Sequence, residues 1–138
     1  MKTHIGIKII KTEPAIQNGE RGYLIYYEEG SEPIWVTRDL VDKNYFELHS
    51  SNNTISGEDV TRFIKSADYV KVGEKTTLTT VTLVNGFELT ETSSCVDPAN
   101  FSLEMGHNIN MGKIKDKIWF LLGFLLQSAV SGFSNEDE

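Results

Sequence analysis

The chain has little of the chemistry that staples small secreted proteins or reads nucleic acids. Its 138 residues include a single cysteine, Cys95, so an intramolecular disulfide is excluded and nothing points to an oxidising compartment. Acidic residues outnumber basic ones by 20 to 13, which gives a net charge of −7 at pH 7. A diffusely acidic surface repels phosphate, so we expect no direct binding to DNA or RNA. A local site could still hold a small anion, and a basic protein surface remains a possible partner.

Long hydrophobic runs are also missing. The most apolar run, residues 118–130, contains Gln127 and Ser128 and is shorter than the roughly 20 residues of a membrane-spanning helix. The first residues, MKTHIGIKIIK, have a charged start but no adequate apolar stretch and no small-residue cleavage site, so we read no signal peptide. We therefore expect a cytoplasmic protein without membrane contact.

Motifs for catalysis or metal binding are scarce. The three histidines, His4, His49 and His107, have no metal-ligand spacing with one another or with Cys95. No glycine-rich phosphate loop is present. Cys95 precedes a predicted helix but lies outside its first turn and has no Cys-His motif around it, which favours a small buried residue over a nucleophile. We expect a binding protein rather than an enzyme, with no metal and no cofactor.

Short strands dominate the first third of the chain. Isoleucines alternate at positions 5, 7 and 9, and Pro14 predicts the end of that strand. Asn18-Gly19 is a turn signal, and the runs GYLIYYEEG and PIWV predict two further strands. Residues 1–46 are therefore predicted to form a small β-rich module.

A short helix and a linker follow these strands. Thr37 is the predicted N-cap of a helix over residues 38–46, with Asp39 near its positive end. Residues 47–56 are rich in Ser and Asn and lack periodicity, which is typical of a linker.

The remainder predicts a helix, a hairpin and a long helix. The spacing Ser56-x-x-Asp59 resembles a capping box, and a helical face follows it at Val60, Phe63, Ile64 and Ala67. KTTLTTVTLV and FELTETSS predict two strands joined by a two-residue turn at Asn85-Gly86. That turn would place Val84 opposite Phe87, and Thr82 opposite Leu89, on a face that can be buried.

The long helix is predicted to start at Pro98, with Asp97 as its N-cap, and to run towards Val130 with irregularities at Gly106 and Gly112. Apolar residues cover nearly its whole circumference, so we expect a homo-oligomer in which a second subunit covers this C-terminal helix. The predicted fold class is α+β: a small β-rich N-terminal module, then helix, β-hairpin and long helix over residues 57–132. The acidic residues 133–138 form a predicted tail.

Several segments resemble known phage proteins. GEKTTLTTVTLVNGF, SSCVDPANF and KIKDKIWFLLGFLLQSAVSG resemble a family of small tailed-phage proteins named after the gene-forty-nine product of one phage and the gene-sixty-six product of another. The resemblance covers residues 55–132. It implies a bacteriophage accessory protein in the host cytoplasm and carries over no catalytic residues.

Residues 5–46 resemble a second phage module, with the pattern GY-x-V-x-Y-x-DG followed by SW-S-P. The chain departs from that pattern at Val36-Thr37. In other phage proteins the module occurs beside a domain similar to the Thoeris anti-defence family, which sequesters nucleotide immune signals. The resemblance therefore implies only an association with anti-defence functions.

The best candidate ligand site is the polar turn before the long helix. The N–H groups at a helix start attract phosphate or carboxylate. Ser93 and Ser94 would add hydroxyls, Asn100 an amide and Phe101 a stacking surface. The alternative is a capped turn in which Asp97 already occupies the N–H groups.

A second candidate is the aromatic cluster of the first module. Trp35, with the nearby tyrosines, could stack on a base while Arg38 holds a phosphate. The alternative is that these rings form the core of a small module.

The leading hypothesis is a host-takeover or anti-defence protein that sequesters a small nucleotide-like signal. The alternative hypothesis is an acidic protein–protein inhibitor of a host nucleic-acid-binding or defence protein.

Overall fold

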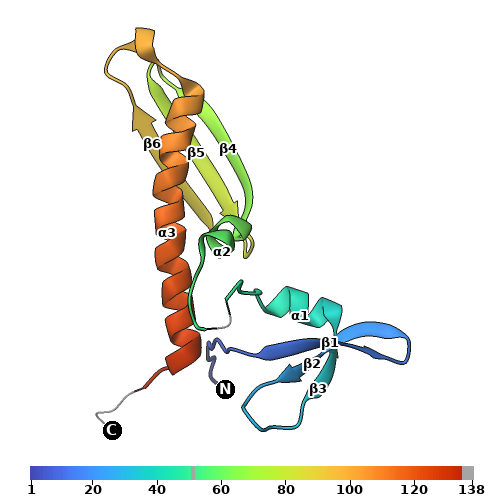
Figure 1. Cartoon of the computed structure of the whole chain (residues 1–138). Helices are drawn as coiled ribbons and strands as arrows, with labels where there is room; N and C mark the ends of the chain where they lie inside the picture. The colour runs from blue at the N-terminus through green and yellow to red at the C-terminus, as the bar shows by residue number, and fades with distance from the viewer. Residues whose placement is uncertain (51, 135–138) are drawn as a thin grey trace. The chain divides into compact units, whose positions relative to one another are not determined.

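The computed structural model describes residues 1–50 and 52–134. Within these residues it confirms the α+β class, with two three-stranded antiparallel sheets, short helices and one long helix, α3 (Leu103–Ser131). The chain divides into two compact units (Figure 1): Met1–Leu48 with the chain from Leu125 onward, and His49–Phe124.

The first unit contains a sheet with strand order β1–β2–β3. Its strands are β1 (Lys11–Gln17), β2 (Glu20–Tyr26) and β3 (Ile34–Thr37). The predicted turn between β1 and β2 is confirmed, because Asn18 and Gly19 have φ angles of 51° and 78°. Two consecutive residues with positive φ give a turn whose twist matches that of the strands it joins.

The first strand begins later than predicted. The isoleucines at 5, 7 and 9 precede β1, and Pro14 lies inside β1 opposite Tyr23 instead of ending a strand. Proline cannot donate a hydrogen bond, but β1 is an edge strand, where one row of N–H groups needs no partner. Alternation alone therefore misplaced this strand.

Helix α1 (Arg38–Asn44) starts where the sequence predicted and ends two residues early. Thr37 Oγ1 accepts a hydrogen bond from the Leu40 N–H at 3.3 Å, and Asp39 lies in the first turn. Val41 on this helix and Ile25 at the centre of the sheet are buried. These side chains form the small core of the first unit.

The second unit opens with α2 (Gly57–Arg62), whose start confirms the predicted capping box. Ser56 Oγ accepts from the Asp59 N–H, and the Asp59 carboxylate accepts from the Ser56 N–H. The prediction that this helix continues to Ala67 is wrong, because strand β4 (Ile64–Val72) already begins at Ile64. Pairing with a neighbouring strand along most of its length outweighs a helical periodicity that was carried by few residues.

The sheet of the second unit has the order β4–β5–β6. Strands β5 (Thr76–Leu83) and β6 (Glu88–Ser94) confirm the two predicted hairpin strands. β5 is central, and its side chains alternate strictly between a buried face and a half-buried face. The buried face consists of Thr77, Thr79, Val81 and Leu83.

The predicted two-residue turn at Asn85-Gly86 is wrong. Thr82 pairs with Glu88, so the loop comprises residues 84–86. Gly86 has a φ of 87°, and its N–H donates to the Leu83 carbonyl at 2.9 Å. A three-residue loop that ends on a left-handed glycine is the next commonest hairpin connection.

The longer loop shifts the register of the hairpin by one residue. Leu89 therefore lies opposite Val81 instead of Thr82, and the shift turns each side chain to the other face of the sheet. Val84 and Phe87, which were expected opposite each other on a face that can be buried, are exposed.

Helix α3 lies along the face of this sheet that carries the buried β5 side chains (Figure 1). It is continuous through Gly106 and Gly112, so the predicted irregularities are absent. Residues at intervals of four share one helical face, and this face buries Asn110, Ile114, Ile118 and Leu122.

Polar side chains set the position of α3 along β5. The Asn110 side-chain amide, fully buried, donates to the Thr77 carbonyl at 3.0 Å and to Thr79 Oγ1 at 3.1 Å. Thr79 Oγ1 also lies 3.0 Å from His107 Nδ1, and the His107 ring stacks on Tyr69 at 3.9 Å. Buried polar groups are costly unless they are hydrogen-bonded, so a helix that slid along the strand would lose these pairs.

Candidate functional site

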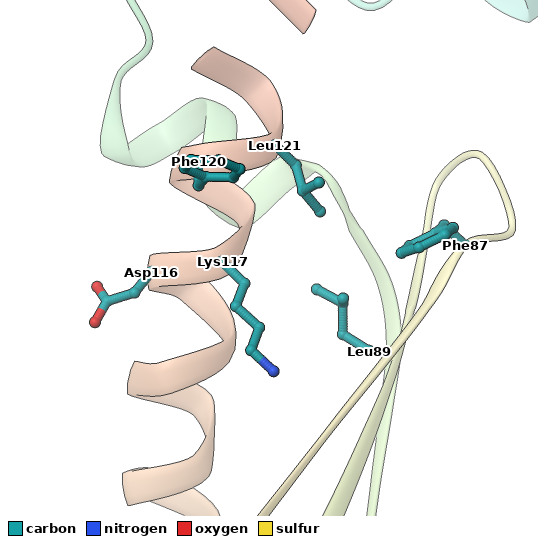
Figure 2. A pocket seen from close by; sticks show the side chains of 6 residues that line it. All are labelled: Phe87, Leu89, Asp116, Lys117, Phe120 and Leu121. Atoms are coloured by element: carbon teal, nitrogen blue, oxygen red, sulfur yellow. The ribbon is translucent and has the colours of Figure 1, made fainter. Parts of the chain in front are cut away.

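A groove lies between the β5–β6 hairpin and the middle of α3, within the second unit (Figure 2). Its volume is about 360 Å³, and four of the six residues that line it are apolar. The residues that line it are Phe87, Leu89, Asp116, Lys117, Phe120 and Leu121.

The hairpin forms one wall of the groove, because the observed register turns the Leu89 side chain of β6 towards the helix. Leu89 shares the helix-facing side of the sheet with buried Val81, and Phe87 follows directly after the glycine turn. Figure 2 shows the Phe87 ring beyond Leu89, at the end of the hairpin and facing the gap. A two-residue turn would have sent Leu89 to the other face of the sheet.

The helix builds the opposite wall. Lys117 and Leu121, four residues apart, point towards the hairpin, whereas the Phe120 ring lies on the front of the helix (Figure 2). Asp116 points away from the hairpin in the same view. The groove wall on α3 therefore lies directly beside the buried side of the helix that faces the sheet.

One ion pair borders the groove. Lys117 Nζ lies 2.8 Å from Glu91 Oε1 on β6. The hydrogen bond from Lys117, with further attraction from Lys113, holds the pKa of Glu91 below its usual value, against a smaller opposing effect of burial. Because Lys117 is already paired, the groove has little positive charge to offer a phosphate.

Large aromatic side chains stand exposed around the groove. Phe120 is 75% exposed and Phe87 is 56% exposed, and Phe124 one turn further along α3 is exposed as well. Exposed apolar patches on a folded domain commonly mark interaction surfaces. Aromatic side chains are also the residues that most often carry the binding energy of protein interfaces.

The predicted ligand turn is not at the start of the long helix. Pro98–Asn100 form a single 3-10 turn, in which Asp97 Oδ1 accepts from the Ala99 N–H at 2.9 Å. The long helix starts only at Leu103, and Ser102 Oγ accepts from the Met105 N–H there. The predicted start at Pro98 is therefore wrong, and the argument from a long helix's N–H groups does not apply to Asp97.

The other residues of that predicted site are arranged separately. Ser93 Oγ donates to the Gly106 carbonyl at 3.0 Å, whereas Ser94 Oγ lies 2.7 Å from Thr76 Oγ1 on the other face of the sheet. The Phe101 ring lies under the ammonium group of Lys71 at 4.8 Å. Asn100 is exposed. Asp97, Asn100 and Phe101 therefore lie in or beside one short turn, but the two serine hydroxyls lie on opposite faces of the sheet.

Trp35 and Arg38 lie in the first unit. Trp35 Nε1 donates to the Ala15 carbonyl at 3.1 Å, and its half-buried ring lies where a side chain on Gly22 would have to sit. Arg38 forms an exposed ion pair with Asp42 at 3.5 Å. These contacts agree with the alternative in which the tryptophan belongs to the core of the module.

Tyrosines of the same module also pair within it. Tyr26 donates to Glu13 Oε1 at 2.6 Å, and this hydrogen bond is the main reason that the pKa of Tyr26 is raised. Burial first, and then a hydrogen bond with Tyr27, raises the pKa of Tyr45. The aromatic cluster is thus tied to its own sheet and helix.

Sequence reasoning missed the groove. It predicted Leu89 on a buried face and Phe120 on an apolar helix, but the two positions are about thirty residues apart and no local signal joins them. Within residues 1–50 and 52–134, no cluster of three or more His, Cys, Asp or Glu side chains is arranged to hold a metal ion. In the same residues, none of the helices has both the length and the apolarity needed to cross a bilayer.

Comparison with known proteins places the chain in a family. No curated protein and no solved structure matches it. The model of the family described as "Phage protein (N4 Gp49/phage Sf6 gene 66)" matches residues 55–130, which is more than half of the chain. The match includes every residue that lines the groove. The chain therefore belongs to the N4 Gp49/Sf6 gene 66 family of phage proteins.

Proposed function

We propose that this phage protein is a non-enzymatic accessory protein that acts in the host cytoplasm by binding another protein through the groove between the hairpin and α3. The observation that carries the proposal is the exposed apolar groove of Phe87, Leu89, Phe120 and Leu121. Such a cavity accepts one or two apolar side chains of a partner, and the surrounding aromatic rings supply contact area.

A protein partner suits the groove better than a nucleotide does. Small-molecule sites usually combine apolar walls with several convergent polar groups. Here the charged side chains at the groove are Asp116, which points away from the hairpin, and Lys117, which is paired with Glu91. A phosphate would find no unpaired cation within this lining.

The acidic character of the chain favours a partner that has a basic surface. Its net charge of −7 would attract such a surface at long range and speed association, while the groove would supply the short-range energy. Within this proposal the protein serves in host takeover or anti-defence as an inhibitor of a host protein. Sequestration of a nucleotide-like signal becomes the competing outcome of the test.

The test is selection from a random peptide library on the immobilised chain, followed by calorimetric titration of the selected peptides. We expect peptides with apolar or aromatic anchors, and Phe87→Ala should weaken their binding about tenfold, the usual loss when a central aromatic contact is removed. Phe133→Ala is the matched control, because Phe133 is 71% exposed but does not line the groove. Its effect should be within about twofold.

Two results would contradict the proposal. One is equal peptide affinity for the chain and for Phe87→Ala. The other is a nucleotide from a screened panel that binds in native mass spectrometry, is unaffected by Phe87→Ala, and is lost in Asn100→Ala. The second result would return the Asp97–Phe101 turn to first place.

A further inference from the structure

One exposed side of α3, away from the buried stripe, is apolar at both ends and charged in the middle. Met105 and Ile109 are exposed on the first part of this side, and Phe120 and Phe124 are exposed on the last part. At 3.6 residues per turn, Met105, Ile109 and Phe120 lie roughly opposite the buried stripe of Ile114 and Ile118, whereas Phe124 lies about 80° from Ile114. Met105, Ile109 and Phe120 are not among the buried residues of the second unit.

The order of residues along this side is self-complementary. Ile109 and Phe120 are equally far from the midpoint between residues 114 and 115, and so are Met105 and Phe124. Lys113 and Asp116, of opposite charge, flank the same midpoint. We name this set (Met105, Ile109, Lys113, Asp116, Phe120 and Phe124) the pairing face.

We propose that the pairing face binds the pairing face of a second copy of this chain, with the two α3 helices antiparallel about a twofold axis beside residues 114 and 115. In this arrangement Ile109 of one copy meets Phe120 of the other. Lys113 of each copy meets Asp116 of the other, which forms two symmetric ion pairs. A twofold interface is isologous, so one self-complementary face is sufficient to build it.

Charge decides the direction and the register. A parallel pair would place Lys113 against Lys113 and Asp116 against Asp116, and like charges across an interface are repulsive. The antiparallel pair matches opposite charges and apolar residues at once. Lys113 Nζ donates to the Thr92 carbonyl at 3.3 Å in the single chain, but an ammonium group has three donors and leaves two for a partner.

A glycine on the same side of α3 fits a close approach. A side chain at Gly123 would meet no heavy atom within 4 Å in the chain, so no contact inside the described structure requires glycine there. Glycine nevertheless weakens a helix interior relative to alanine. In the antiparallel pair Gly123 lies beside Met105 of the second copy, where the missing side chain leaves room.

The inference goes beyond the proposed function, because the pairing does not require the groove to bind anything, but Asp116 and Phe120 contribute to both surfaces, so a dimer would cover part of the groove wall. Ile109 and Lys113 belong to the pairing face alone, and Phe87 and Leu89 belong to the groove alone. Variants at these positions therefore separate a failure of the pairing from a failure of groove binding.

The test is sedimentation equilibrium of the purified chain across micromolar concentrations. We expect twice the chain mass of 15.5 kDa, and Ile109→Asp should return it to the chain mass. The matched control is Val96→Asp, at an apolar residue that is 93% exposed and precedes α3, outside the pairing face. This control should remain a dimer, and circular dichroism should show that both variants are folded.

A charge swap tests the register even if Ile109→Asp fails to fold. Lys113→Asp or Asp116→Lys alone creates two like-charge contacts and should weaken the dimer roughly tenfold. The double variant restores opposite charges and should return the dissociation constant to within about threefold of the original. A monomer throughout, a higher oligomer, or a double variant that is as weak as the single ones would overturn the proposal.

Discussion

The Asp59 side chain is a buried charge on which the start of the second unit depends. It is fully buried, yet it accepts hydrogen bonds from the His49 N–H at 2.8 Å, the Ser56 N–H at 2.9 Å and Arg62 Nη2 at 2.7 Å. These bonds connect the first turn of α2 to the segment that precedes it. Removing the carboxylate would leave three donors without their acceptor.

The size of the effect follows from this geometry. A hydrogen bond to a charged group contributes about 1.5–3 kcal/mol, and breaking a buried ion pair by removing one partner costs about 3–5 kcal/mol. We expect Asp59→Ala to lower the free energy of unfolding by about 3 kcal/mol, the lower end of that range, because Arg62 is partly exposed and regains water. Asp59→Asn keeps one acceptor oxygen but turns an amide N–H2 towards a donor, so a loss of about 2–3 kcal/mol is expected.

The effect must also depend on pH. Burial alone would raise the pKa of Asp59, but hydrogen bonds from Ser56, His49 and Arg62 together outweigh it and lower the pKa from its ordinary value of 3.8. Because the folded pKa is lower than the unfolded one, this stabilisation is complete above the unfolded pKa and is lost as pH falls through the folded pKa. The difference in the free energy of unfolding between the unchanged chain and the Asp59→Asn variant should therefore narrow below about pH 4.

Urea unfolding, followed by circular dichroism from pH 7 to pH 2.5, measures both effects. Glu58→Gln is the control, because Glu58 is adjacent, is 68% exposed and forms an ion pair with His49 Nδ1 at 3.0 Å. An exposed pair of this kind should cost less than about 1 kcal/mol. The reasoning fails if Asp59→Asn is as stable as the unchanged chain at pH 7, or if its deficit does not shrink in acid.

Two further predictions concern packing of the second unit. Gly106→Ala should destabilise this unit by about 1–3 kcal/mol in thermal unfolding. The new Cβ would lie against Thr77 Oγ1, 2.7 Å from Thr77 Cβ and 3.1 Å from Ser93 Oγ. An unchanged melting temperature would mean that α3 can move away from β5. Cys95→Ser should retain peptide binding and lose less than about 1 kcal/mol of stability, since the half-buried thiol donates only to the Asp97 carbonyl at 3.2 Å. Loss of binding in a folded Cys95→Ser variant would show that the thiol takes part in function.

Features that depend on a few adjacent residues were readable from the sequence. The Asn18-Gly19 turn, the Thr37 cap and the Ser56–Asp59 capping box each act within one turn of chain, so residue type and spacing determine them. The motifs in residues 55–130 likewise identified the family. These local signals agreed with the tertiary structure because nothing distant competes with them.

Features that depend on pairing between distant segments were decided only by the tertiary structure. Residues 64–72 became a strand because β5 was available as a neighbour, and one extra loop residue at 84–86 moved Leu89 to the helix-facing side. The groove needs that register together with Lys117 and Leu121 on α3. A one-residue change in register reverses which side chains are buried, so no reading of single segments could have placed the groove.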